Sequence, residues 1–303
     1  KWGIPLPVDE SQTIYVWFDA LINYISAIGY ADDGDTFSRY WPANLHVIGK
    51  DITRFHCVLW PAMLMSAGVD LPACVLGHGF VSFKGERMSK SLGNILNPLD
   101  VVEKFGPDPL RYYLLKEVPL DRDGDFSWEL FIERYNADLA NDLGNLVSRT
   151  LAMIVRYNGG RVEELWVSDG KMGELQAVAE TSIEEYLSHM EGLRIDRAVQ
   201  SAWKLIKRAN QYIQETAPWQ LAKQETNRER LLSVLNALLE SIRIVSVLLF
   251  PIMPGKSVEM WKYAGFSGSP DETRIRTLAW SGKAVEAGRT VGQATPLFPR
   301  ISS

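Results

Sequence analysis

The chain has 303 residues, 46% hydrophobic and 23% charged, and 32 Lys and Arg against 37 Asp and Glu give a net charge of −5. This length suits about two domains, the composition excludes disordered, collagen-like and coiled-coil proteins, and the charge argues against polyanion binding through bulk charge alone. With two cysteines, Cys57 and Cys74, the chain has too few for a disulfide framework or a four-cysteine metal site. We expect a reducing compartment and a cytoplasmic protein.

The sequence predicts neither a secretory leader nor a membrane span. The longest apolar candidate, residues 242–254, contains Arg243 and is interrupted by Pro251 and Pro254. Residues 1–7 contain two prolines and no apolar signal core, and the chain has no initiator methionine. We therefore expect a segment of a longer protein.

The first quarter of the chain alternates strands and helices. Short apolar runs at 14–18, 45–48 and 73–76 predict buried strands, and residues 51–67 predict a helix. This order is typical of a parallel sheet. The run 80–83 followed by the turn 84–86 predicts a hairpin that leads into a polar loop.

The rest of the chain is predicted to be helical. Small helices are expected around Pro107 and Pro109, and from Ser127 onward apolar residues recur every three to four positions without strands, which indicates a helical bundle. The last ~20 residues are rich in Gly, Ala, Thr and Pro and predict a tail packed on the surface.

The polar loop 84–94 is the first candidate for chemistry. Lys84, Arg87 and Lys90 lie within seven residues, interleaved with Gly and Ser. Mobile cations of this kind stabilise the charge that develops on a transferring phosphate. A solvated hairpin tip is the ordinary alternative.

Two further segments carry candidate binding residues. Gly49 ends a predicted strand and Asp51 begins the next helix, where a carboxylate can bind a ribose hydroxyl or cap the helix. Trp17, Ala20 and Tyr24 are spaced to wall a narrow apolar slot suited to a thioether, although aromatic residues at this spacing usually belong to a core.

The helical half carries a possible base-reading surface. Asn141, Asn145 and Arg149 step by four along one predicted helix, and Trp219 follows a helix end. Amides and a guanidinium can bind base edges, and an indole can stack on a base. A solvated helix face and a packed tryptophan are the ordinary alternatives.

Several of these strings resemble one enzyme family. Arg87-Met88-Ser89-Lys90-Ser91 resembles the Lys-Met-Ser-Lys-Ser signature of class I aminoacyl-tRNA synthetases, with arginine in place of the first lysine. The runs 16–24, 46–56, 145–149 and 217–219 resemble methionyl-tRNA synthetases in particular. The resemblance extends from Trp2 to Arg300.

The resemblance implies a role for each matching residue. The implied catalytic residues are Lys90 and Arg87. Gly49, Asp51, Ser89 and Lys90 would bind ATP. The implied methionine site consists of Trp17, Ala20, Tyr24, Ile52, His56 and Trp60. Asn145, Arg149 and Trp219 would contact the CAU anticodon of methionine tRNA. From its residues alone, His56 reads more simply as a core histidine.

The resemblance also implies an architecture of α/β plus all-α class. Residues 1–79 would form the second half of a Rossmann-type parallel-sheet catalytic domain, 80–127 a connecting segment with the Arg87–Ser91 loop, and 128–303 a helical-bundle anticodon-binding domain with a C-terminal tail. The substrates would be methionine, ATP with Mg²⁺, and methionine tRNA, and the intact enzyme would be a monomer.

The family's first signature is absent from this chain, as is its zinc-bearing insertion. We therefore expect the chain alone to be inactive in adenylation and to bind no metal, a zinc site belonging to the missing N-terminal half. Two alternatives stay open: a sister class I synthetase for leucine, isoleucine, valine or cysteine, and an RNA-binding module without catalysis.

Overall fold

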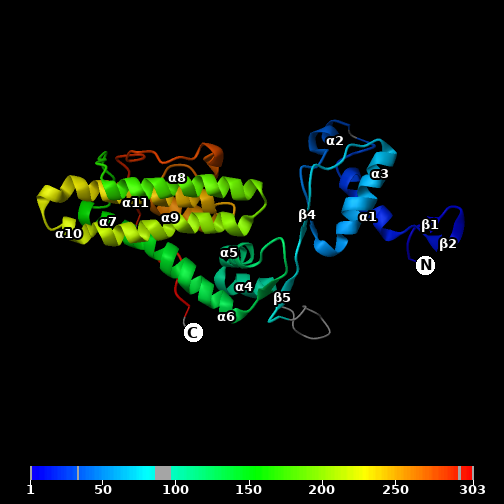
Figure 1. Cartoon of the computed structure of the whole chain (residues 1–303), viewed down its shortest axis with the longest axis horizontal. Coiled ribbons are helices and arrows are strands. Elements are labelled where there is room, and N and C mark those ends of the chain that lie inside the picture. The colour runs from blue at the N-terminus through cyan, green and yellow to red at the C-terminus, as the bar shows by residue number, and fades with distance from the viewer. Residues whose placement is uncertain (1, 33, 86–96, 293–294, 302–303) are drawn as a thin grey trace. The chain divides into compact units, whose positions relative to one another are not determined.

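The computed structural model describes residues 2–32, 34–85, 97–292 and 295–301. The chain divides into two compact units, one made of Lys1–Phe80 with Leu120–Asp123, and the other of Val81–Pro119 with Gly124–Ser303. Unit 1 combines strands and helices, whereas unit 2 is largely helical (Figure 1). The α/β plus all-α class predicted from the sequence is confirmed.

Unit 1 contains a parallel strand pair. β3 (His46–Gly49) and β4 (Val75–His78) pair so that His46 lies opposite Val75 and Gly49 opposite His78. A helical stretch connects them, as the sequence predicts. It begins as a 3₁₀ turn at Lys50–Ile52, passes through a π-helical turn at Phe55–Leu59 and ends as α3 (Trp60–Ala67). The connection is therefore a βαβ unit, the building block of parallel sheets.

The prediction of a strand at 14–18 is wrong. The structure forms β2 (Asp9–Thr13) and then the helix α1 (Val16–Ser26). The aromatic and β-branched residues of this run favour a strand locally, but Leu21 and Ile25, one helical turn apart, are both buried in the core of unit 1. Tertiary packing therefore overrides the local β preference.

The remaining elements of unit 1 are short. β1 (Pro5–Leu6) pairs with β2 in antiparallel fashion, and α2 (Gly34–Tyr40) lies between α1 and β3 in the chain. The core that holds α1 against α3 consists of Leu21, Ile25, Trp41, Trp60 and Leu64.

Unit 2 begins with a second parallel strand pair. β5 (Val81–Phe83) lies beside β6 (Gly124–Phe126), with Val81 opposite Gly124. The turn predicted after residue 83 is present, since Lys84 and Gly85 both have positive φ angles of 53° and 78°. The second strand of the predicted hairpin lies outside the described residues.

Two small helices connect these strands, as the prolines predict. They are α4 (Pro98–Phe105) and α5 (Pro107–Glu117). The Arg111 side chain on α5 donates to the carbonyl oxygens of Pro251 and Ile252, both at 2.8 Å, and the Asp108 carboxylate accepts from the backbone N–H of Lys256. The connecting helices are therefore fixed to the bundle.

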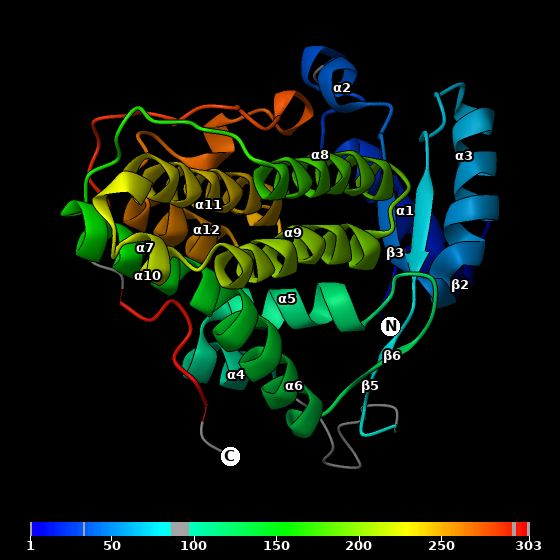
Figure 2. The same ribbon diagram turned by 60° about the vertical axis from the view of Figure 1, so that its left-hand side comes forward.

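The bundle begins with three helical segments in direct succession. α6 (Trp128–Arg134) continues as a π-helix at Tyr135–Leu143 and then as α7 (Gly144–Asn158). The longest helices follow and lie alongside one another (Figure 2). The later elements are α8 (Gly170–Glu191), α9 (Ile195–Thr216), α10 (Pro218–Leu221), a 3₁₀ turn at Glu225–Asn227, α11 (Arg228–Leu249), α12 (Pro254–Tyr263), and 3₁₀ turns at Pro270–Glu272 and Ile275–Thr277.

The central helix of the bundle is α11. It contacts α7, α8, α9 and α12, and almost all of its side chains are buried. The stretch Glu225–Leu249 is long and apolar enough to cross a membrane by length and composition, but 94% of its apolar window is buried inside the protein. Its hydrophobic surface on all sides is therefore explained by its central position.

The C-terminal tail packs on the bundle and contributes to its core. Leu297 and Phe298 are buried, and the Phe298 ring meets Tyr135 edge to face. The Asn136 side chain forms two hydrogen bonds with the backbone of Ile301, at 3.0 and 2.9 Å. The tail is thus held along the π-helical segment.

The start of α8 gives a testable stability contribution. The Asp169 carboxylate accepts a hydrogen bond of 2.9 Å from the N–H of Met172 and a second of 3.1 Å from Arg230. We expect Asp169→Ala to lower the free energy of unfolding by about 1 kcal/mol, because the helix loses its N-cap. Arg230→Ala removes the exposed ion pair alone and should cost clearly less. Urea denaturation measures both, and equal losses would contradict the capping role.

Candidate functional site

The predicted amino-acid site brings together side chains from two helical stretches. Trp17 and Tyr24 project from α1, and His56 and Trp60 come from the stretch that follows β3. The Tyr24 hydroxyl lies 2.9 Å from His56 Nε2. The Trp17 ring lies 6.2 Å from the His56 ring, and the Trp60 ring 6.0 Å from the Tyr24 ring. Ala20 lies on the same face of α1, between Trp17 and Tyr24 in sequence.

These side chains differ in exposure in a way that suits a binding surface. His56 and Trp60 are each 1% exposed, whereas Ala20 and Tyr24 are exposed and Trp17 is half-buried. The Ile52 carbonyl lies 3.0 Å from His56 Nδ1. His56 is therefore a core histidine with both ring nitrogens hydrogen-bonded, and it also supports the exposed Tyr24.

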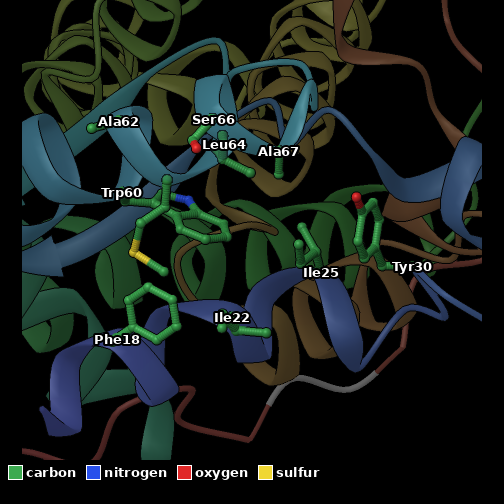
Figure 3. A pocket seen from close by; sticks show the side chains of 10 residues that line it. Phe18, Ile22, Ile25, Tyr30, Trp60, Ala62, Leu64, Ser66 and Ala67 are labelled. Atoms are coloured by element: carbon green, nitrogen blue, oxygen red, sulfur yellow. The ribbon is translucent and has the colours of Figure 1, made fainter. Parts of the chain in front are cut away.

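An apolar cavity of about 500 Å³ lies on another side of α1. Figure 3 shows Phe18, Ile22 and Ile25 of α1 on one side of it and Trp60 on the other. Among the residues predicted for the amino-acid site, Trp60 alone lines this cavity. Residues 17, 20 and 24 occupy a different face of the helix from residues 18, 22 and 25. The cavity is thus distinct from the predicted slot.

The predicted nucleotide residues lie at the carboxyl end of β3. Gly49 is the last strand residue, and Asp51 lies exposed in the 3₁₀ turn. The capping alternative for Asp51 is wrong, because Gly49 occupies the N-cap position and no side chain caps the turn. A Cβ atom at Gly49 would lie 2.7 Å from the Asp51 carboxylate, so the glycine leaves room for it. This edge of a parallel pair is where α/β folds bind ligands.

The predicted catalytic residues Arg87, Ser89 and Lys90 lie outside the described residues. The described residues before them are anchored by Asp125, whose Oδ1 accepts from the N–H of Gly85 and the hydroxyl of Ser82, both at 2.8 Å. No sequence pattern points to Asp125, because it lies forty residues away along the chain and only the β5–β6 pairing brings it to this turn.

Two of the three predicted anticodon residues lie on α7. Asn145 is exposed and Arg149 is half-buried. With the Gln214 amide oriented so that its oxygen faces Arg149, this oxygen accepts from both terminal guanidinium nitrogens at 3.0 and 3.1 Å. Trp219 lies in α10, just after Ala217 ends α9 in a left-handed conformation, and it is 37% exposed. Gln214 lies near the end of α9, the helix that precedes Trp219 in the chain, and contacts Arg149 of α7.

A cavity of about 350 Å³ adjoins the exposed asparagines of α7. Asn141 and Asn145 line it together with the tail residues Phe298 and Arg300. The polar residues predicted at 141–149 therefore line a cavity at one end instead of forming a plain solvated helix face. The tail's part in it was missed, because the sequence indicates only that the tail packs.

A buried ionic cluster lies between α5 and the π-helical segment. The Asp138 carboxylate accepts from the Tyr112 hydroxyl at 2.9 Å and from the Lys116 ammonium at 2.5 Å. Burial, and then the negative charge of Asp138, raise the pKa of Tyr112 well above its ordinary value. The tyrosine therefore stays protonated and donates its hydrogen bond, which fixes α5 to the segment that leads into α7.

Metal ligands are not clustered in the part of the chain that the structure describes. Within residues 2–32, 34–85, 97–292 and 295–301, no group of three or more His, Cys, Asp or Glu side chains is arranged to hold a metal ion. Cys57 and Cys74 are both free and exposed.

Two family models match this chain in succession. Residues 1–151 match the model described as tRNA synthetases class I (M), and residues 136–303 match the anticodon binding domain of methionyl tRNA ligase. Together these matches place the chain among the class I aminoacyl-tRNA synthetases.

Curated relatives support the same class over almost the whole chain. The methionine–tRNA ligase of Caldanaerobacter subterraneus is 44% identical over 301 residues, and that of Clostridium perfringens is 44% identical over 305 residues. Each match covers 99% of this chain but only 47% and 46% of the relative. The chain spans about half the length of the curated relatives it matches.

Solved structures agree. Mycobacterium tuberculosis methionyl-tRNA synthetase in complex with methionyl-adenylate superposes with a TM-score of 0.90 at 38% identity, over 99% of this chain and 58% of that one. The apo form gives 0.87 at 35% identity, over 100% of this chain and 59% of that one. The chain belongs to the methionyl-tRNA synthetase family and corresponds to a C-terminal portion of its members.

Proposed function

We propose that this chain provides one part of a methionine-activating centre and the tRNA-reading domain of a methionine–tRNA ligase. The observation that carries the proposal is the convergence of Trp17, Tyr24, His56 and Trp60 on one surface of unit 1. Gly49 and Asp51 follow β3 in the same unit. A relative bound to methionyl-adenylate shares this fold.

The reaction joins methionine to ATP as methionyl adenylate, releases pyrophosphate, and then passes the methionyl group to tRNA. Asp51 would accept a ribose hydroxyl beside Gly49, and Ser89 would contact the phosphates. Lys90, assisted by Arg87, would stabilise the charge on the ATP phosphates in the transition state. Mg²⁺ would accompany ATP as part of the substrate. Catalysis would then depend on orientation and charge stabilisation, without a protein nucleophile.

The wider assignment follows from the same proposal. Residues 1–79 would serve the catalytic domain, 80–127 the connecting segment, and 128–303 the anticodon-binding domain. We infer a cytoplasmic enzyme that is a monomer when intact. The chain alone would not adenylate methionine, and any zinc site would belong to the preceding part of the protein.

The experiment that tests this proposal completes the fold. The part of the Caldanaerobacter ligase that precedes its matched region is joined to this whole chain, and the product is called the completed enzyme below. Methionine-dependent ATP–pyrophosphate exchange should appear in the completed enzyme and be absent from the chain alone. A folded completed enzyme that instead exchanges with leucine, isoleucine, valine or cysteine would contradict the proposal. Exchange by the chain alone would contradict the expectation that this chain is inactive in adenylation by itself.

Anticodon reading can be tested with the chain by itself. We expect Trp219→Ala to weaken binding of methionine tRNA by about 1 to 3 kcal/mol, because a base loses its stacking partner. Trp219→Phe keeps an aromatic face and should lose much less. Filter binding at fixed moderate salt measures both.

The same assay tests which bases are read. Changing one base of the CAU anticodon should weaken tRNA binding by the unmodified chain. If that base stacks on Trp219, the same change should weaken tRNA binding by the Trp219→Ala variant much less. Equal binding of all tRNAs by a folded chain would refute the assignment of Asn145, Arg149 and Trp219.

A further inference from the structure

A segment from the middle of the chain folds back into unit 1, close to the predicted nucleotide residues. Leu120–Asp123 belongs to unit 1, although the residues before and after it in the sequence belong to unit 2. The backbone N–H of Gly79 donates to the carbonyl oxygen of Leu120 at 3.2 Å. A Cβ atom at Gly79 would collide with the backbone of Arg122, so glycine allows this close approach. The segment is therefore packed against the residue that follows β4.

Asp123, at the end of this segment, binds the turn that follows β3. Both of its carboxylate oxygens lie 2.7 Å from the Lys50 ammonium, and Oδ1 also accepts from the backbone N–H of Phe80 at 2.8 Å. The same ammonium lies 5.2 Å from the centre of the Phe80 ring. The hydrogen bond from Lys50, and then the one from Phe80, lower the pKa of Asp123 below its ordinary value. Asp123 is therefore ionised at neutral pH and holds the Lys50 side chain in one place.

The turn that contains Lys50 also contains Asp51. It is a single 3₁₀ turn, Lys50–Ile52, whose first carbonyl oxygen accepts from the Thr53 hydroxyl at 2.7 Å. Among the residues that the structure describes, the Asp51 carboxylate has no hydrogen-bond or ion-pair partner, so it is open to a ligand. Adjacent side chains on a helical turn project in different directions. Holding Lys50 on one side therefore also sets the direction in which Asp51 projects.

We propose that Asp123 is a positioning residue for the nucleotide site, because its ion pair with Lys50 fixes the turn from which Asp51 would reach the ribose of ATP. The inference rests on the proposed function, which assigns the ribose to Asp51. The side chains of Lys50 and Asp123 are 47% and 51% exposed, and exposed pairs contribute little to the free energy of unfolding. The effect of this pair should therefore appear in ATP binding and not in stability.

The first experiment tests the ion pair in the chain itself and needs no enzymatic activity. Carbon-13 NMR of the aspartate carboxyl groups, assigned by single substitution, gives the pKa of Asp123. We expect this pKa to lie below the ordinary aspartate value in the unmodified chain and to rise towards that value in Lys50→Met. Asp9, whose pKa is lowered by hydrogen bonds from Ser11, is the internal control and should be the same in both chains. An Asp123 pKa that does not respond to Lys50→Met would overturn the proposal.

The second experiment measures ATP–pyrophosphate exchange by the completed enzyme. Asp123→Asn keeps an acceptor oxygen for the Phe80 N–H but removes the charge. It should raise the KM for ATP roughly threefold to fivefold, the shift in population expected when an exposed ion pair no longer holds the turn. The KM for methionine and kcat should change little, because the ribose contact serves ATP binding. Asp121→Asn is the matched control and should change none of these values, since Asp121 lies in the same exposed segment and has no bonding partner among the described residues.

A double variant shows whether Asp123 acts through Lys50. Lys50→Met should raise the KM for ATP as much as Asp123→Asn does, and the double variant should raise it no further, since all three remove the same interaction. Lys50→Arg retains a cation and should recover most of the loss. If Lys50 bound the ATP phosphates itself, Lys50→Met would weaken ATP binding while Asp123→Asn left it unchanged or improved it. That pattern would overturn the positioning role of Asp123.

Failure of this inference and failure of the proposed function give different results. A folded completed enzyme that does not exchange methionine would overturn the proposed function, while the titration of Asp123 still reports on the ion pair. Normal methionine exchange with the same KM for ATP in Asp123→Asn and Asp121→Asn would overturn the positioning role alone.

Discussion

Replacing Lys90 by alanine in the completed enzyme should slow methionine-dependent ATP–pyrophosphate exchange by roughly two orders of magnitude. Loss of one group that stabilises developing charge costs about 3 kcal/mol of transition-state stabilisation. Because such a group acts in the transition state, kcat should fall while the KM for methionine changes little. Binding of methionine tRNA to unit 2 should be unchanged.

Lys84→Ala is the matched control for this loop. The Lys84 ammonium forms an exposed ion pair of 3.3 Å with Glu129, in which the two side chains are 55% and 72% exposed. Pairs of this kind contribute between 0 and 1 kcal/mol to stability, so the variant should stay folded. Exchange should change little, because the implied catalytic residues are Lys90 and Arg87. Exchange by Lys90→Ala at the rate of the control would refute a catalytic role for Lys90.

Replacing Glu240 by alanine should lower the free energy of unfolding of unit 2 by about 3 to 5 kcal/mol. The Glu240 side chain is 1% exposed in the middle of α11 and forms two hydrogen bonds of 2.8 Å with Arg243. It also accepts from the N–H of Ser281 at 2.7 Å. Alanine leaves a largely buried guanidinium and a backbone N–H without this partner.

A half-buried glutamate provides the comparison. Glu185 pairs with Lys204 at 2.6 Å, but these side chains are 34% and 56% exposed, so Glu185→Ala should cost at most about 1 kcal/mol. Urea denaturation followed by far-ultraviolet circular dichroism reports both changes in this largely helical unit. Equal losses in the two variants would mean that burial of Glu240 adds nothing.

Long elements with strong periodicity were predictable from the sequence, whereas short ones depended on their surroundings. The bundle helices and the stretch 51–67 are confirmed because each carries a sustained apolar stripe. The run 14–18 has residues typical of a strand but leads into α1, since Leu21 and Ile25 of this helix contact the core at helical spacing. The pairing of β5 with β6 was not predictable, because strands of three residues carry too little pattern.

The candidate site shows the same division. Tyr24, His56 and Trp60 were identified together through a family resemblance, and the structure brings them within contact distance. His46 of β3, whose Nε2 accepts a hydrogen bond of 3.3 Å from Trp60 Nε1, was missed because a single histidine at a strand end carries no motif. One signal was present: His46 and Ile48 alternate with exposed Val47, so the histidine occupies an inward position of β3.

The π-helical segment at Tyr135–Leu143 sets the angular relation between two surfaces of one continuous helix. Asp138, within the segment, faces the buried Tyr112 and Lys116, while Asn145, beyond it, lines the cavity beside the tail. A π-turn accommodates more residues than an α-turn. Each residue of the segment therefore turns less about the helix axis than a residue of an α-helix does. The direction in which Asn145 and Arg149 project from the helix axis therefore depends on the π-helical turns before them as well as on α7 itself.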